Sequence, residues 1–187
     1  MAVVPRARRF TVEEYHRMAE AGVFAPDDHV ELIEGEVIEM APSGNHHASV
    51  VDRLNRLLVQ RVGDRAIVRV QGPVRLARLR SEPQPDLLLL KPREDFYAHA
   101  AAGADDVLLL IEVMDTSVEY DRRRKAPLYA RAGITELWLV DLPAGIVDMH
   151  REPVATEYRD VRTLGRGETL SPRAFPDVAL RVGDVLG

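Results

Sequence analysis

Three apolar runs of strand length constrain the fold of this chain more than any other feature. The first is Leu87 to Leu90, four consecutive leucines that follow Asp86. The second is Val107 to Val113, interrupted only by Glu112, and the third is Ile134 to Asp141. Runs as apolar as these are typical of strands that are covered on both faces. We therefore predict a sheet with at least three central strands.

Helical patterns alternate with these strands, which predicts an α/β or α+β class. Thr11 and Glu14 form a capping-box pattern for a first helix that ends near Gly22, and Gly35 marks the turn of a hairpin. The other predicted elements are helices over His46–Val62, Arg93–Gly103 and Arg122–Ala132, a strand pair or one bent strand over Ala66–Leu79, an edge hairpin at Ile146–His150, and short strands near Glu157–Leu164 and Val178–Val182.

Length and composition narrow the class of protein. The chain has 187 residues, and we predict one domain over residues 1–187. It has no cysteine, which excludes disulfides, thiol nucleophiles and zinc–thiolate sites. No apolar run is long enough to span a bilayer, and no signal-like segment follows the N-terminal arginines. We expect a soluble cytoplasmic protein with no membrane partner.

The charge pattern singles out Lys125 as a candidate functional residue. The net charge of −5 argues against a protein that coats nucleic acid, although it allows a local basic cleft. Of 25 basic residues only Lys91 and Lys125 are lysines. Lys91 stands at a strand end, where a surface position explains it. Lys125 shares a helical stripe with Leu128 and Tyr129, which predicts that it faces the core. Pro127, in the same stretch, must lie near the first turn of the helix or kink it.

Two carboxylates also occur where an apolar core is predicted. Asp86 opens one buried strand and Glu112 is enclosed by apolar neighbours in another. A buried carboxylate must be hydrogen-bonded, paired with a cation or bound to a metal. Together with Lys125 they form a set that can hold a divalent cation against a phosphate. The alternative is a pair of structural salt bridges, in which an arginine caps each carboxylate.

Two further polar residues lie beside apolar patterns. In the predicted hairpin, Glu31 shares a face with Ile33 and Ile38, so it is either a site residue or an edge glutamate that reaches solvent. His47 lies at the N-terminal end of the apolar stripe of the helix that starts at His46. A single histidine in that position is more often a half-buried capping residue than a catalytic one.

Four sequence blocks resemble a known family. They are Glu31 to Glu36, Gln84-Pro85-Asp86-Leu87, Ile111-Glu112-Val113, and Asp121 to Lys125 continuing through Leu128-Tyr129-Ala130 to Asp141. In this order they resemble the Uma-two family of restriction-endonuclease-like proteins, within the PD-(D/E)XK nuclease superfamily. The chain departs from the usual superfamily pattern in having Met114 where a lysine stands two residues after the glutamate. The resemblance implies that the lysine has moved to Lys125.

The resemblance implies a fold, a site and a reaction. The fold is a restriction-endonuclease-like core, in which helices flank a mixed central sheet, with an N-terminal helix and hairpin. Asp86, Glu112 and the carbonyl of Val113 would bind Mg²⁺ or Mn²⁺, and Lys125 would assist the attacking water. Glu31 would be an additional acidic residue of the site and His47 a contributor. The expected function is a DNA endonuclease without a small-molecule cofactor, and by analogy with related folds we expect a homodimer.

Two other readings stay open at the level of sequence. The chain could be a catalytically inactive nucleic-acid- or protein-binding module on the same fold, which the acidic net charge favours. It could also be a structural α/β domain whose carboxylates are held in buried ion pairs. Neither the recognition sequence nor the choice between DNA and RNA follows from the residues.

Overall fold

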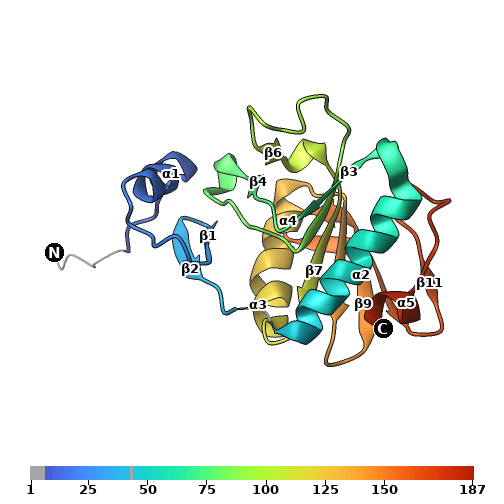
Figure 1. Ribbon diagram of the computed structural model, residues 1–187. Helices are drawn as coiled ribbons and strands as arrows, with labels where there is room; N and C mark the ends of the chain where they lie inside the picture. The colour runs from blue at the N-terminus through green and yellow to red at the C-terminus, as the bar shows by residue number, and fades with distance from the viewer. Residues whose placement is uncertain (1–6, 43) are drawn as a thin grey trace. The chain divides into compact units, whose positions relative to one another are not determined.

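The computed structural model describes residues 7–42 and 44–187 (Figure 1). The chain forms two compact units. The first comprises residues 7–42 together with Arg75–Pro83, and the second comprises residues 44–74 together with Gln84–Gly187. The single domain over 1–187 stays a prediction. Within the described ranges no helix combines the length and apolar character that crossing a bilayer requires.

The first unit contains helix α1 (Val12–Glu20) and a hairpin of β1 (Val30–Ile33) and β2 (Glu36–Glu39). The predicted capping box is present, because Thr11 accepts a hydrogen bond from the Glu14 amide and Glu14 accepts one from the Thr11 amide. Gly35 lies in the two-residue turn with φ of 80°, a backbone conformation that glycine adopts without strain. The predicted hairpin register is confirmed, and it sets Glu31 opposite Ile38.

The second unit is built on a six-stranded sheet of order β10-β9-β8-β7-β5-β3. Strands β7 and β8 are parallel and every other neighbouring pair is antiparallel, so the sheet is mixed. The three predicted central strands are confirmed as β5, β7 and β8. The bounds are β3 Ile67–Val70, β5 Leu87–Leu90, β7 Val107–Met114, β8 Glu136–Asp141, β9 Ile146–Val154 and β10 Glu157–Gly165.

Helices flank this sheet. Helix α2 (Asn45–Val62) buries the stripe predicted from its sequence and packs with α5 (Val182–Leu186) in the main core. Alternate residues of β5 and β7, such as Leu87, Leu89 and Ile111, join that core. The crossover from β7 to β8 is one continuous helical stretch. It consists of α3 (Val118–Tyr120), a π-helical segment (Asp121–Lys125) and α4 (Ala126–Ala132), and it ends at Gly133, whose φ is 80°.

Short elements complete the chain. They are β4 (Val74–Arg75), β6 (Ala102–Gly103), β11 (Thr169–Leu170), β12 (Leu180–Arg181) and 3-10 turns at Gly63–Arg65, Ala77–Leu79 and Ala104–Asp106. The predicted α/β class, with a mixed central sheet, flanking helices and an N-terminal helix and hairpin, is confirmed.

The helix predicted over Arg93–Gly103 is wrong. The segment forms turns and ends in β6. Asp95 is the physical reason, because its carboxylate binds the Arg93 guanidinium and also accepts a hydrogen bond from the Tyr97 amide. Local side-chain bonds of this kind compete with the helical hydrogen bonds of the backbone.

Two strand predictions are also corrected. The segment Ala66–Leu79 is neither a strand pair nor one bent strand, because β3 pairs with β5 and β4 is a separate short strand. Strand β9 is not at an edge, since it lies between β8 and β10.

Candidate active site

Asp86 is the loop residue immediately before β5, and it lies beside the C-terminal part of β7. Its Oδ2 atom accepts hydrogen bonds from the Val113 amide at 2.8 Å and from His47 Nε2 at 3.1 Å. The β5–β7 register pairs Leu87 with Ile111, and extending it by one residue sets Asp86 opposite Glu112. The Asp86 side chain is 13% exposed, so it is held by its neighbours yet still reaches solvent.

His47 projects from the first turn of α2 and is buried. Its hydrogen bond to Asp86 raises the pKa of the imidazole, and this effect outweighs the opposing effect of burial. The histidine therefore stabilises one orientation of the Asp86 carboxylate. Sequence spacing placed His47 at the end of the apolar stripe, but the contact with Asp86 is a tertiary one.

Glu112 forms a second group of contacts, with residues of the crossover helix. Its Oε1 atom accepts a hydrogen bond from the Tyr129 hydroxyl at 2.5 Å and lies 3.3 Å from Lys125 Nζ. Lys125 Nζ is also 3.8 Å from Asp121 Oδ1, and Asp121 accepts a hydrogen bond from Ser117 Oγ at 2.5 Å. Glu112, Lys125 and Asp121 are each at most 3% exposed. A buried ammonium thus lies between two buried carboxylates, which offsets the desolvation of all three.

The π-helical segment gives this helix its unusual geometry. The Ala126 amide donates to the Asp121 carbonyl, a bond that spans five residues rather than the usual four. Pro127 has no amide hydrogen to donate, and its ring would clash with a carbonyl four residues earlier in a regular helix. The wider turn lies immediately before Pro127 and relieves that clash. Pro127 is therefore accommodated at the start of α4, as the sequence required, and the helix stays continuous.

Arg122, on the same segment, contacts two other carboxylates of the sheet. Its Nη2 atom is 3.0 Å from Asp141 Oδ2 and 2.6 Å from Asp148 Oδ2. Asp148 also accepts a hydrogen bond from Thr163 Oγ1 at 2.5 Å. These ion pairs attach the π-helical segment to β8 and β9, in addition to the contact of Lys125 with Glu112 on β7.

The backbone of Val113 contributes an acceptor on the Asp86 side of β7. In a strand the amide and the carbonyl of one residue point to the same side, and successive residues alternate. The Val113 amide binds Asp86, whereas the Met114 carbonyl accepts from the Leu142 amide beyond β8. The Val113 carbonyl therefore faces the same side as Asp86, beyond the first residue of β5.

The donor set has the chemistry that a hard divalent cation requires. Within residues 7–42 and 44–187 no group of three histidine, aspartate or glutamate side chains is arranged to hold an ion by itself. Two carboxylates, from Asp86 and Glu112, and the Val113 carbonyl are nevertheless oxygen donors on neighbouring backbone positions. Mg²⁺ commonly takes one or two carboxylates from a protein and completes its shell with water and substrate phosphate. The residues present fit such a site.

The structure brings together most of the predicted site residues. His47, Asp86 and Val113 form one group, Glu112 and Lys125 form the other, and the peptide bond between Glu112 and Val113 joins them. Glu31 lies on β1 in the first unit, where it is buried, and its part in the site stays a prediction.

Sequence reasoning missed Tyr129, Asp121 and Ser117 as partners of the charged residues. A signal for two of them was present, because Asp121 and Tyr129 stand four residues before and after Lys125. Residues at that spacing lie on one face of a helix, so the stripe that carries Lys125 also carries its neighbours.

The chain is similar to one family model, to a relative in another organism and to a solved structure. The model of a family described as "Uma2: Putative restriction endonuclease" matches residues 12–183. A protein of Synechocystis sp. described as uncharacterized is 27% identical over 132 residues, which cover 69% of this chain and 72% of the relative. The crystal structure of a putative nuclease belonging to DUF820 from Anabaena variabilis is similar in fold. Its TM-score is 0.72 at 14% identity, and the match covers 95% of this chain and 97% of that one.

Proposed function

The chain belongs to the Uma2 family, described as putative restriction endonucleases, and from this premise we propose that it is a metal-dependent endonuclease that hydrolyses phosphodiester bonds in DNA. The observation that supports the proposal is a pair of contacts on neighbouring residues of β7: Asp86 accepts from the Val113 amide, and Lys125 lies against the Glu112 carboxylate. The carboxylates of Asp86 and Glu112 are acidic and the Lys125 ammonium is cationic, and the three come from the loop before β5, from β7 and from the π-helical segment.

The proposed roles follow from the contacts. Asp86, Glu112 and the Val113 carbonyl would hold Mg²⁺, or Mn²⁺ in its place. When bound, the cation lowers the pKa of a coordinated water and neutralises charge on the phosphate. Lys125 lies against Glu112 and would hold the attacking water and stabilise negative charge that develops on the phosphate. His47 orients Asp86 through its hydrogen bond. Glu31 is proposed as a further acidic residue of the site.

Cleavage of supercoiled plasmid tests the proposal. With Mg²⁺ or Mn²⁺ present the protein should nick the DNA, and chelation should stop the reaction. Lys125→Met keeps the aliphatic volume of a buried side chain and removes its charge, so we expect cleavage to fall at least ~100-fold, a loss typical of removing one transition-state charge partner.

Lys91→Ala is the matched control. Lys91 is the only other lysine of the chain and is exposed beside the far end of β5. The Lys91→Ala variant should cleave plasmid at the rate of the unaltered protein. Thermal unfolding shows whether each variant is folded, so that a loss of cleavage caused by the missing charge can be told from one caused by unfolding. Equal cleavage by a folded Lys125→Met protein would refute the role of Lys125.

One observation favours a second candidate, a catalytically inactive binding module. Glu112, Lys125 and Asp121 compensate one another inside the protein, an arrangement that a purely structural ion cluster would also have. Calorimetric titration with Mn²⁺ distinguishes the two candidates. A folded protein that neither binds the cation nor nicks DNA would be assigned to the binding module.

A further inference from the structure

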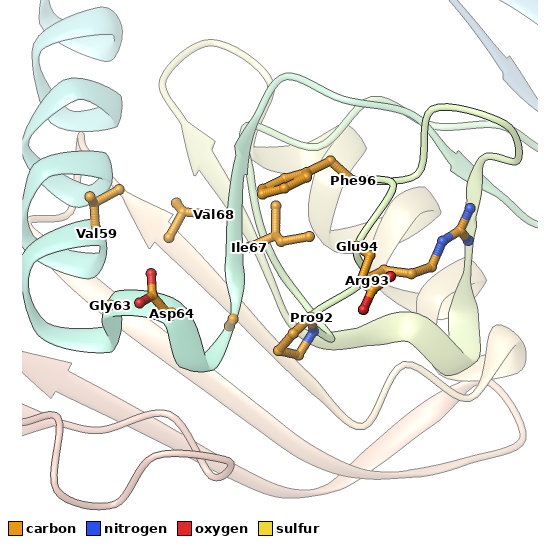
Figure 2. A pocket seen from close by; sticks show the side chains of 10 residues that line it. Val59, Gly63, Asp64, Ile67, Val68, Pro92, Arg93, Glu94 and Phe96 are labelled. Atoms are coloured by element: carbon orange, nitrogen blue, oxygen red, sulfur yellow. The ribbon is translucent and has the colours of Figure 1, made fainter.

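The charges around Lys125 are enclosed by protein and do not belong to a surface hollow. A hollow of about 580 Å³ lies along β3 of the second unit, where Val59 and Phe96 contribute to its lining (Figure 2). The described residues that line it include none of the candidate site. Lys125 and Asp121 are instead 2% and 3% exposed, so the groups packed around them determine where each charge lies.

The Lys125 ammonium lies between two carboxylates that come from different elements. Its Nζ atom is 3.3 Å from Glu112 Oε1 on β7 and 3.8 Å from Asp121 Oδ1, four residues earlier on the crossover helix. Glu112 is also one of the ligands proposed above for a divalent cation. A cation at Glu112 would attract the charge of that carboxylate and repel the ammonium. A buried ammonium is strongly destabilising when it loses its counter-charge, so the contact with Asp121 gains importance as the cation binds.

Ser117 holds the Asp121 carboxylate in this position. Ser117 is the N-cap residue of α3, and a serine there usually accepts a hydrogen bond from a backbone amide of the first turn. Its hydroxyl makes no such bond and donates instead to Asp121 Oδ2 at 2.5 Å. The Asp121 amide in turn donates to the Ser117 carbonyl at 2.9 Å. Two bonds to one residue therefore orient Asp121, while its Oδ1 atom faces Lys125.

We propose that Asp121, held by Ser117, is a positioning residue that keeps the Lys125 ammonium in place when a divalent cation binds Glu112. This inference rests on the proposed function, because it requires the cation site at Asp86 and Glu112. Asp121 acts through Lys125 and contacts neither the cation nor the substrate. Without the Asp121 charge, the cation and the ammonium compete for the Glu112 carboxylate.

Calorimetric titration of the full chain with Mn²⁺ tests the inference. Asp121→Asn should weaken Mn²⁺ binding at least ~10-fold, because the ammonium then draws on Glu112 alone of these two carboxylates. In the Lys125→Met protein the same substitution should change Mn²⁺ binding by less than ~2-fold, because no ammonium is left to compete with the cation. A direct contact of Asp121 with the cation would instead give equal losses in the two backgrounds.

A second pair of variants tests the part of Ser117. Ser117→Ala should also weaken Mn²⁺ binding, and Ser117→Thr, which keeps a hydroxyl, should restore it. Glu119→Gln is the matched control, since Glu119 and Arg123 form a pair of the same spacing on the same helix, but on its exposed side. That substitution should leave Mn²⁺ binding unchanged. Thermal unfolding shows whether each variant is folded.

The outcomes separate this inference from the proposed function. If the unaltered protein binds Mn²⁺, then an unchanged affinity in Asp121→Asn, or equal losses in the two backgrounds, would overturn the inference and leave the cation site standing. If the unaltered protein binds no Mn²⁺, the proposed function fails and the inference fails with it. If Asp121→Asn does not fold, the Ser117 variants decide: a loss in Ser117→Ala that Ser117→Thr does not restore would reject the inference.

Discussion

At the scale of single residues, the Tyr129 hydroxyl lies closer to Glu112 than the Lys125 ammonium does. The hydroxyl is 2.5 Å from Oε1, whereas Lys125 Nζ is 3.3 Å from the same atom. Tyr129 therefore sets the orientation of the carboxylate more tightly than the ion pair does, since charge-assisted bonds are strongest at short distance. A neutral donor in this position holds Glu112 without adding a second cation.

Tyr129→Phe should destabilise the protein by ~1–3 kcal/mol, because the buried Glu112 carboxylate loses one of its hydrogen-bond donors. It should also lower plasmid cleavage ~10-fold or more. Urea unfolding and the nicking assay measure the two effects. Tyr158→Phe is the control, because that hydroxyl is also buried but donates to the Ile134 carbonyl outside the site. Equal loss of cleavage in both variants would show a general effect of the lost hydroxyl.

His150 on β9 provides a pH-dependent contribution to stability. Burial lowers the pKa of its imidazole from the ordinary value of 6.5; nearby Asp148 opposes the shift and Arg122 adds to it. The unfolded chain then binds the proton more tightly than the folded one. The free energy of unfolding should fall as pH drops below 6.5 toward the lowered pKa, and be unaffected by His150 above 6.5.

His150→Phe tests this sign, because it keeps an aromatic ring against Tyr158 and removes the titration. Urea unfolding at pH 7.5 and at pH 5, taken as values about one unit or more on either side of the ordinary imidazole pKa, gives the comparison. The unaltered protein should lose more stability between the two values than the variant does. Parallel losses would mean that other groups account for the pH dependence.

At the scale of elements, the crossover helix combines a proline, a π-helical turn and the key lysine. The inserted turn changes the angular position of every residue before it relative to α4, by ~100° for one residue. Lys125 and Asp121 precede Pro127, while Tyr129 follows it. The π-helical turn spans Asp121 to Ala126, so it sets how Asp121 is placed relative to Tyr129 on α4.

Pro127→Ala should let the helix adopt regular hydrogen bonding and move Lys125 away from Glu112. We expect cleavage to fall ~10-fold or more, while stability changes by no more than ~1 kcal/mol, because the alanine amide gains a bond as the ion pair weakens. Nicking and thermal unfolding measure the two quantities. Full activity in this variant would mean that the π-helical turn does not depend on the proline.

The sequence predicted those helices and strands whose pattern lies within the segment itself. Strands β5, β7 and β8 and helices α1 and α2 could be predicted, because apolar periodicity and capping residues are visible within each segment. The Arg93–Gly103 segment could not, since its fold depends on the bonds of Asp95 to Arg93 and Tyr97. The full length of β9 was also missed, because the polar residues from His150 onward conceal its second half, whereas β10 ends one residue beyond its prediction.

At the scale of the whole molecule, cation binding should be coupled to folding. A cation that binds only the folded protein stabilises it by about 2.7 kcal/mol at a concentration 100 times its dissociation constant. Mn²⁺ should therefore raise the thermal midpoint of the unaltered protein. Asp86→Asn should abolish that rise, whereas Asp177→Asn, which alters an exposed carboxylate paired with Arg65, should preserve it. A rise of the same size in Asp86→Asn would place the cation elsewhere.

The charged residues of the candidate site could be predicted from the sequence, whereas the contacts between them could not. Asp86, Glu112 and Lys125 stood out because a charge in an apolar pattern is visible from the sequence alone. The contact of His47 with Asp86 joins residues 39 positions apart, so no local pattern reports it. The division into two units was not predicted either, because the segment Arg75–Pro83 joins the N-terminal residues across an intervening helix and strand.

The division of the chain into two compact units limits how its gene can recombine with those of relatives. The first unit is closed by a backbone bridge between Leu32 and Glu82, so it is assembled from two separate stretches of the gene. No single recombination breakpoint removes it alone, and truncation of the N-terminal stretch would leave Glu82, four residues before Asp86, without its backbone partner Leu32. Shuffling among relatives should therefore succeed when both stretches are exchanged together, and chimaeras that exchange only one should be recovered rarely.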